Sequence, residues 1–256
     1  MGKVIAFINE KGGVGKSSIC FNVGWHFAEK GKKVLMIDLD GQRANLTFIA
    51  GIEKSEEVAT LYDVLVEGVD IKKTVLVVED NLHIVPATNN VVSLYHDNCS
   101  LGDMQQAVNE LKLYYDYIFI DVGPTPNHGH ALALAASDGI IIPMLPDVTS
   151  LEANMGIVES VRAIQLIANP DLRVLGIVFN KFTLRTLLSS RVAATAEKMA
   201  QAFNSRVFRT KLRQTVTMSE HVGQHVGITA YAPKSKCASD IKQLCEEIEE
   251  VLNNGR

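Results

Sequence analysis

The stretch that decides the fold reads Glu10-Lys11-Gly12-Gly13-Val14-Gly15-Lys16-Ser17-Ser18. It follows the apolar run 4–8 and precedes a segment with apolar residues at Ile19, Val23 and Phe27. This order is typical of a strand, a glycine loop and a helix. Three glycines in four residues let the backbone curl with its N–H groups inward, and the positive end of the helix dipole adds to them. The stretch therefore predicts a polyphosphate site, with a plain glycine turn between strand and helix as the alternative.

Two side chains of this loop indicate the chemistry of the site. Lys16 is expected to bridge the outer phosphates, and the hydroxyl of Ser17 is expected to bind Mg2+. The predicted phosphate-contact residues are Gly12, Gly13, Val14, Gly15, Lys16, Ser17 and Ser18.

The loop departs from the general P-loop pattern, because Glu10 stands where that pattern has glycine, six positions before Lys16. It fits the deviant form Lys-Gly-Gly-x-Gly-Lys-Ser/Thr, and here the chain resembles the ParA/MinD family of P-loop ATPases. Within that family it is most similar to the ParA-type partition proteins, from Lys3 to about Val251. The resemblance implies ATP and Mg2+ as cofactors. It also implies that Lys11 is the signature lysine, which reaches across a dimer interface to phosphates bound by the other subunit.

Length and composition predict a soluble protein with one domain over residues 1–256. Apolar residues make up 47% of the chain and charged residues 21%. No apolar run approaches the roughly 20 residues that span a bilayer, and the chain begins directly with a strand, so we expect a cytoplasmic protein. The four cysteines are scattered without a Cys-x-x-Cys pair, a spacing that favours neither a disulfide framework nor a zinc site.

Short apolar runs alternate with helical patterns along the chain, which predicts an α/β fold with a doubly wound, mainly parallel sheet flanked by helices. After the glycine loop, strands are expected at 34–37, 82–88, 117–121, 140–143 and 174–179, and helices at 61–67, 101–113 and 186–203. The residues from 68 to 80 read as a polar and acidic connection.

Acidic residues follow two of the predicted strands. Asp38 and Asp40 close the strand at 34–37, and Asp121 closes the strand at 117–121, so all three belong to the edge where open α/β sheets bind ligands. Asp121 has the Walker B position and is predicted to hold Mg2+. The resemblance implies that Asp40 orients the attacking water, with Asp38 in support. A turn with helix-capping aspartates is the alternative for the pair.

In the two switch loops, three features differ from the family's usual pattern. Gly41 replaces a proline, the stretch from Gly41 to Thr47 is one residue longer with Arg43 as the insert, and Gly123 replaces the first proline of switch II. Both glycines are expected to loosen their loops. The resemblance also places a base-contacting residue at Asn180, for which a simple turn asparagine is the alternative.

Charge is distributed unevenly along the chain. Residues 180–219 hold eight Lys or Arg against one acid, a balance of +7 that leaves −11 for the rest of a chain with net charge −4. The family binds DNA without sequence preference through basic residues in this region, although the two usual arginine positions correspond to Gln214 and Thr217. The DNA-binding candidates are Arg185, Arg191, Arg206, Arg209, Lys211 and Arg213, and a solvated basic surface is the alternative.

The expected function is a ParA-type ATPase that forms a nucleotide-sandwich homodimer, associates with DNA and hydrolyses ATP slowly to partition DNA or another cargo. A ParB-like adaptor is the expected partner, with nucleoid association in the ATP-bound state. The alternatives are a MinD-like membrane-positioning ATPase and a nucleotide-gated scaffold with little turnover. MinD-like proteins end in a basic amphipathic helix, whereas residues 240–252 carry five acids and one lysine, which disfavours binding to anionic lipid.

Overall fold

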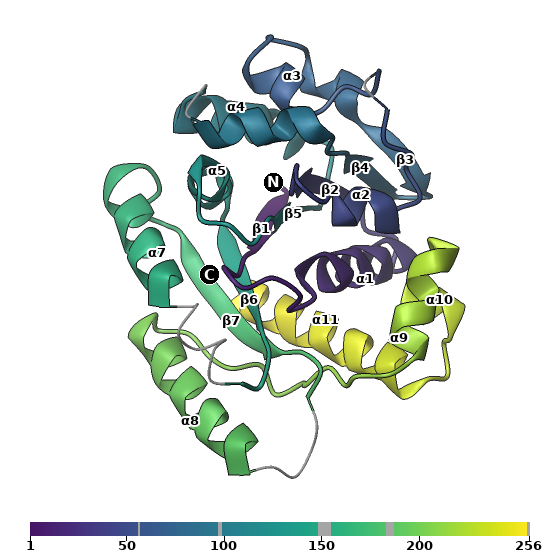
Figure 1. Ribbon diagram of the computed structural model, residues 1–256, viewed down its shortest axis with the longest axis vertical. Helices are drawn as coiled ribbons and strands as arrows, with labels where there is room; N and C mark the ends of the chain where they lie inside the picture. The colour runs from purple at the N-terminus through teal and green to yellow at the C-terminus, as the bar shows by residue number, and fades with distance from the viewer. Residues whose placement is uncertain (56, 97–98, 148–154, 183–186, 255–256) are drawn as a thin grey trace.

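The computed structural model describes residues 1–55, 57–96, 99–147, 155–182 and 187–254, apart from the side chains of 95, 155 and 187–191. Within them, one seven-stranded sheet has the order β3-β4-β2-β5-β1-β6-β7 (Figure 1). β3 is antiparallel to β4, and all other neighbouring strands are parallel. This arrangement confirms the predicted fold class. The strands are β1 (Lys3–Phe7), β2 (Val34–Leu39), β3 (Leu76–Glu79), β4 (Leu82–Val85), β5 (Tyr117–Val122), β6 (Gly139–Met144) and β7 (Arg173–Phe179).

The sheet separates two hydrophobic cores, because successive side chains of a strand point to opposite faces. In β1, Val4 and Ala6 belong to one core and Ile5 and Phe7 to the other. Helices α4, α5, α7 and α8 cover the first face, and α1, α10 and α11 cover the second (Figure 1). The described helices are α1 (Lys16–Glu29), α2 (Asn45–Ile49), α3 (Leu61–Leu65), α4 (Leu101–Leu111), α5 (His128–Ala136), α7 (Met155–Ile167), α8 (Leu187–Ala202), α9 (Thr217–Glu220), α10 (Ile228–Tyr231) and α11 (Lys236–Asn254), with 3-10 turns η1 (Ile71–Thr74), η2 (Asn89–His96) and η3 (His221–Gln224).

The interpretation of residues 68–80 as a connection was wrong, because they contain η1 and the edge strand β3. Val77 is 71% exposed, and the other side chains of β3 are half-buried or exposed. The strand forms through antiparallel pairing with β4, in which Val77 lies opposite His83. Such a half-exposed strand lacks the continuous apolar run that marks the buried strands.

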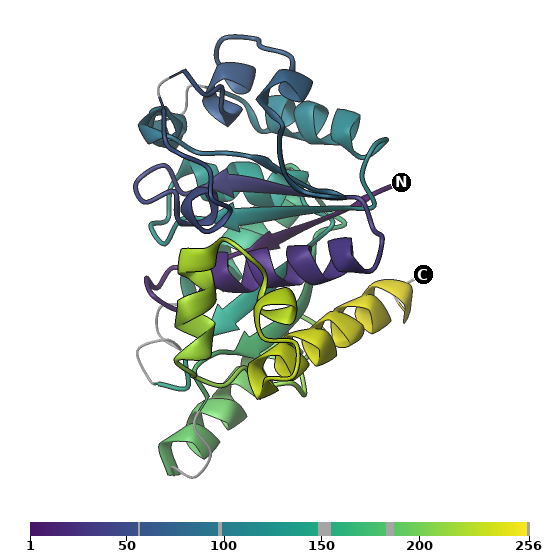
Figure 2. The same ribbon diagram turned by 90° about the vertical axis from the view of Figure 1, so that its right-hand side faces the viewer.

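The parallel strands place the functional loops at one edge of the molecule. The segments that follow β1, β2, β5, β6 and β7 all leave from the carboxyl ends of the strands, where open α/β sheets bind ligands. Figure 2 shows both chain termini on the opposite side, near the amino ends of the strands. Among the described residues, no helix has the length and apolar character needed to cross a bilayer.

A buried glutamate joins α11 to the segment that follows α8. Glu247 accepts hydrogen bonds from the backbone N–H of Arg209 and of Thr210, both at 2.8 Å, and from the Thr210 hydroxyl at 2.6 Å. These bonds lower the pKa of the Glu247 carboxyl, although burial opposes the shift. By contrast, Glu250 forms only a 3.0 Å ion pair with the exposed Arg209 guanidinium.

We expect Glu247→Ala to lower the free energy of unfolding by about 2–3 kcal/mol, because it removes charge-assisted bonds and leaves two backbone donors without their acceptor. Glu250→Ala is the matched control and should change it by about 0.5 kcal/mol or less, since it removes only a surface ion pair. Urea unfolding measures both. Folding lowers the pKa of Glu247. The difference in unfolding free energy between the native chain and Glu247→Ala should therefore disappear as the pH falls through that lowered pKa. Equal effects of the two variants would contradict the anchoring role of Glu247.

Candidate functional site

The glycine loop has the backbone of a phosphate cradle. Gly13 and Gly15 have φ values of +75° and +91°, which side chains other than glycine rarely tolerate. Gly15 is the N-cap of α1, and no side chain caps the helix there. The first N–H groups of α1 therefore remain available as hydrogen-bond donors to a ligand. The predicted contact residues Gly12, Gly13, Gly15, Lys16, Ser17 and Ser18 line a common cavity of about 290 Å3, whereas Val14 is buried.

Polar side chains from two strand ends hold the loop in shape. Asn180 Nδ2 donates to the Val14 carbonyl at 2.8 Å, and Lys181 Nζ donates to the Gly13 carbonyl at 3.2 Å. Asn9 accepts a 2.7 Å bond from the Lys11 N–H and donates to the Pro143 carbonyl at the end of β6. Side chains that follow β7 thus occupy two carbonyls of the loop, those of Gly13 and Val14.

Asn180 therefore has a second use beside the predicted base contact. Its Nδ2 lies 2.2 Å from where a Cβ on Gly15 would be, so the close approach requires glycine. Its Oδ1 accepts from the Lys181 N–H at 2.8 Å. Both polar ends of the Asn180 amide thus bind the protein, and its contact with a base stays a prediction.

Lys16 is buried at the mouth of α1, where it is 7% exposed. Its Nζ donates to the Asn9 carbonyl at 3.1 Å. Burial lowers the pKa of its ammonium, while the carboxylates Asp121 and Asp40 oppose that shift. The phosphates of a bound ligand would supply the negative charge that favours the protonated lysine.

Asp38 acts as a structural hub of the loop after β2. It accepts bonds from the Thr47 N–H at 2.8 Å, the Thr47 hydroxyl at 2.7 Å and the Asp40 N–H at 2.9 Å. Burial raises the pKa of Asp38 to about 6 despite these bonds. The side chain of Asp38 thus binds the backbone that carries Asp40, and its supporting role in hydrolysis stays a prediction.

Asp121 is the residue whose surroundings fit a metal ion. It is fully buried, and neither carboxylate oxygen has a hydrogen-bond partner of standard geometry. Burial and the neighbouring Asp38 raise its pKa well above the usual value, although the nearby Ser17 hydroxyl and Lys16 ammonium oppose the shift. A buried carboxylate with unsatisfied oxygens beside a hydroxyl is a pair of oxygen ligands that Mg2+ takes together with phosphate and water. No cluster of three or more His, Cys, Asp or Glu is arranged for a metal within the described ranges, so Ser17 and Asp121 would depend on those additional ligands.

Asp40 lies at the cavity with the loop after β5 beside it. The Asp40 side chain lines the cavity and is only 4% exposed as a residue. A Cβ on Gly123 would come within 3.3 Å of the Asp40 Oδ1. His130 Nε2 donates to the Gly123 carbonyl at 2.8 Å, and burial lowers the pKa of His130 to about 4. A neutral histidine at pH 7 thus anchors the glycine that the sequence suggested would loosen this loop.

Lys11 lies at the rim of the site, tied to its own subunit. Its Nζ is 2.8 Å and 2.9 Å from the two carboxylate oxygens of Asp147, which follows β6. Their side chains are 25% and 37% exposed. An ion pair this accessible to water contributes little stability.

Arg43 was read from the sequence only as an inserted loop residue, yet it lines the same cavity as Lys16 and Asp40. No spacing rule signals this, because the position of the side chain depends on how the loop after β2 folds back over the phosphate cradle.

The predicted DNA-binding residues have different surroundings. Arg213 pairs with both oxygens of Asp240, at 2.6 and 2.8 Å, and Arg209 pairs with Glu247 and Glu250. Lys211 Nζ lies 4.4 Å from the centre of the Phe182 ring. Arg185 lies outside the described residues, and only the backbone of Arg191 is described, within α8.

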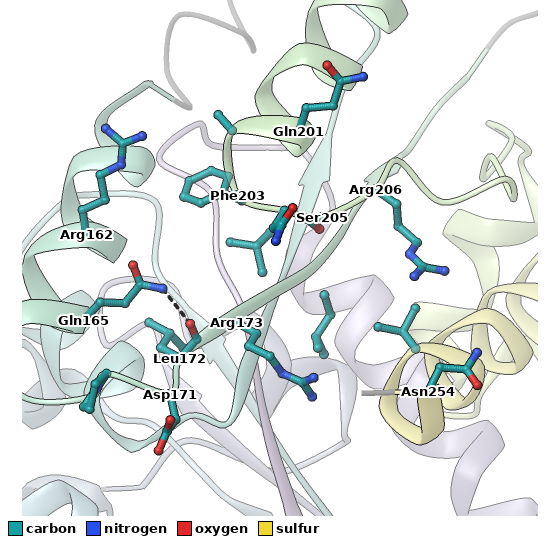
Figure 3. A pocket seen from close by; sticks show the side chains of 16 residues that line it. Arg162, Gln165, Asp171, Leu172, Arg173, Gln201, Phe203, Ser205, Arg206 and Asn254 are labelled. Carbon is teal, nitrogen blue, oxygen red and sulfur yellow. Dashed lines mark hydrogen bonds between the residues drawn. The ribbon is translucent and has the colours of Figure 1, made fainter. Parts of the chain in front are cut away.

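Arg206 lines a cavity of about 810 Å3 at the amino end of β7. Arg162 of α7 and Arg173 of β7 lie around the same cavity, with Asp171 as its acidic residue (Figure 3). This concave surface is at the sheet edge opposite the glycine loop. The sequence did not reveal it, since Arg162 and Arg173 lie outside the basic segment.

We expect Asp121→Asn to raise the melting temperature of the ligand-free protein by about 2–4 °C, because it removes a buried charge whose desolvation opposes folding. Folding raises the pKa of this carboxyl, so the gain should shrink as the pH falls and Asp121 takes up a proton. The same variant should lose Mg2+-dependent nucleotide binding. Calorimetric melting with and without Mg2+ and nucleotide measures both effects, and a variant that is less stable without ligand would disprove this account of Asp121.

Comparisons with known proteins identify the family of this chain. A family model described as an AAA domain matches residues 2–174. The sporulation initiation inhibitor protein Soj of Bacillus subtilis is 33% identical over 256 residues, which cover 97% of this chain and 98% of that protein. The chromosome-partitioning ATPase Soj of Thermus thermophilus is 31% identical over 246 residues, with 95% and 94% covered. The solved structure of apo McdA from Cyanothece matches with a TM-score of 0.85 at 21% identity, covers 98% of this chain and 100% of that one, and supports the fold. The sequence relatives, the glycine loop and the sheet together show that this chain belongs to the ParA/MinD family of P-loop ATPases.

Proposed function

We propose that this chain is a ParA-type partition ATPase that acts as one domain over residues 1–256. It binds ATP and Mg2+, forms a nucleotide-sandwich homodimer and associates with DNA without sequence preference. Slow hydrolysis of ATP then releases the dimer, and a ParB-like adaptor couples the cycle to DNA or another cargo. The proposed location is cytoplasmic, on the nucleoid in the ATP-bound state.

The observation that carries this proposal is a phosphate cradle with two lysines in different positions. Lys16 is buried at the helix mouth, whereas Lys11 lies at the rim in a half-exposed ion pair with Asp147. A triphosphate concentrates far more negative charge than one carboxylate, so the phosphates of a facing subunit can displace Asp147 from Lys11 at little cost. This geometry supports a lysine that acts across a dimer interface.

DNA is the proposed surface partner rather than a membrane. Ile241, Leu244 and Ile248 of α11 are buried in the core against α1 and the sheet, so the last described helix does not present an apolar face for lipid. The arginines around the cavity of about 810 Å3 (Figure 3) lie at the amino end of β7, whereas the nucleotide site lies at the carboxyl ends of the strands. In a dimer that closes over the nucleotides, the edge with these arginines faces outward and can meet phosphates of a duplex.

The rate of ATP hydrolysis distinguishes a partition ATPase from a nucleotide-gated scaffold. Asp40 at the cavity and Asp121 beside Ser17 support hydrolysis. Phosphate release from the native chain, measured with and without DNA, tests the difference: release that DNA or the adaptor accelerates supports the ATPase, and binding without release supports the scaffold.

We expect Lys11→Ala to bind nucleotide with unchanged affinity but to lose ATP-dependent dimerisation, because Lys11 is outside the cradle of its own subunit. Asp147→Ala is the matched control. It removes the same ion pair but keeps the lysine, so dimerisation should persist. Light scattering with a slowly hydrolysed ATP analogue measures the dimer. A Lys11→Ala chain that dimerises like the native protein would rule out the role across the interface.

We expect the double variant Arg162→Glu/Arg206→Glu to lose ATP-dependent retention on random duplex DNA. The double variant Lys72→Glu/Lys73→Glu changes the net charge equally but alters exposed residues of η1, at the other end of the sheet order, and should retain DNA. The native salt slope of log K should correspond to roughly −0.9 per phosphate contact. If both double variants bind equally, the arginine surface is not the contact, and if the native chain shows no difference between ATP and ADP, the DNA proposal fails as a whole.

A further inference from the structure

The loop after β2 holds the backbone of Arg43 in a defined place. A Cβ on Gly41 would lie 2.7 Å from the Val92 N, so glycine lets this loop pack directly against η2. The Arg43 N–H donates to the Asp40 carboxylate at 3.3 Å, and Lys54 Nζ donates to the Arg43 carbonyl at 2.6 Å. The replacement of the family's proline by Gly41 therefore accompanies a packed loop, and it leaves little freedom in the backbone that carries Arg43.

The side chain of Arg43 belongs to the phosphate cavity. It lines that cavity together with Gly13, Lys16, Ser17 and Asp40. Its positive charge is near enough to Lys16 to contribute to the lowered pKa of that ammonium. Arg43 is exposed, and no carboxylate in the described part of the chain forms an ion pair with its guanidinium. A guanidinium that shares a cavity with a buried lysine gains most from an anionic ligand with several oxygens.

We propose that Arg43 is a catalytic residue that places a guanidinium on the terminal phosphate of ATP bound to its own subunit. The proposal rests on the ATPase function proposed above. In hydrolysis, the water oxygen bonds to the terminal phosphorus, and the bond from that phosphorus to the bridging oxygen breaks. The electron pair of that bond leaves with ADP, and the protons of the water pass to the inorganic phosphate and the solvent.

Arg43 suits this step because charge spreads over the three outer oxygens of the transferred group as the old bond breaks. The planar guanidinium can bind two of those oxygens through parallel N–H groups held in a fixed fork, whereas the ammonium of Lys16 is a compact charge whose donors rotate. Asp40, bonded to the Arg43 N–H, is the candidate that orients the water. The inserted residue thus joins the predicted water-orienting carboxylate and a phosphate-binding cation in one short loop.

The test compares Arg43→Ala with Arg43→Lys, and with Lys73→Ala as a control that removes one exposed positive charge of η1, outside the phosphate cavity. Titration calorimetry in the presence of Mg2+ measures the affinity for ADP and for ADP with aluminium fluoride, which imitates the phosphoryl group in transfer. Single-turnover phosphate release measures the chemical step. The melting temperature and the ADP affinity show whether each variant keeps the native fold.

We expect Arg43→Ala to keep its ADP affinity, to bind the fluoroaluminate complex at least tenfold more weakly, and to release phosphate roughly 10- to 1,000-fold more slowly. Arg43→Lys should recover part of both losses, and Lys73→Ala should match the native chain. Equal fluoroaluminate affinity and equal turnover in Arg43→Ala and the native chain would overturn the role of Arg43 while leaving the ATPase intact. A native chain that binds no ATP would overturn both proposals.

Discussion

Two buried carboxylates at the carboxyl ends of neighbouring strands constrain the rest of the site. Asp38 of β2 and Asp121 of β5 are register partners in the sheet, and both side chains are fully buried. Burial raises the pKa of both carboxyls, and repulsion adds to the shift, from Asp40 at Asp38 and from Asp38 at Asp121. Three hydrogen bonds stabilise the charged form of Asp38. At Asp121, the nearby Ser17 hydroxyl and Lys16 ammonium favour the charged form. The arrangement without ligand therefore favours binding of a cation between Asp121 and the phosphate loop.

The glycine loop needs backbone N–H groups that remain available as donors to phosphate. Asn180 and Lys181, which follow β7, donate hydrogen bonds to the carbonyls of Val14 and Gly13. Asn9 connects the start of the loop at Lys11 to the end of β6. The cradle thus depends on three strand ends as well as on its glycines. Contacts from residues far away in the sequence thus restrain the backbone at Gly13 and Val14, next to the left-handed positions Gly13 and Gly15.

The two edges of the sheet carry different charge arrangements. At the nucleotide edge, the three buried aspartates Asp38, Asp40 and Asp121 accompany one buried lysine, Lys16. At the other edge, arginines surround an open cavity (Figure 3). Between them, α11 contributes Asp240 and Glu247 as partners for Arg213 and Arg209. Part of the positive charge in the basic segment between 180 and 219 is therefore used in ion pairs that hold this segment against α11. Only the rest remains for an external partner.

The sequence by itself determined the sheet, the glycine loop and the acids that follow the strands, because each depends on local patterns. An apolar run, a glycine triplet or an aspartate at a strand end has the same meaning in any parallel α/β protein. Tertiary structure alone decided the contacts between residues distant in sequence. Lys11 and Asp147 meet across 136 positions, and Arg162, Arg173 and Arg206 gather from three elements around one cavity. The edge strand β3 exists only through its pairing with β4, and Arg43 reaches the cavity only because Gly41 lets its loop pack against η2. The physical reason is the same in each case, since a contact between distant residues depends on the packing of whole elements, which no local pattern records.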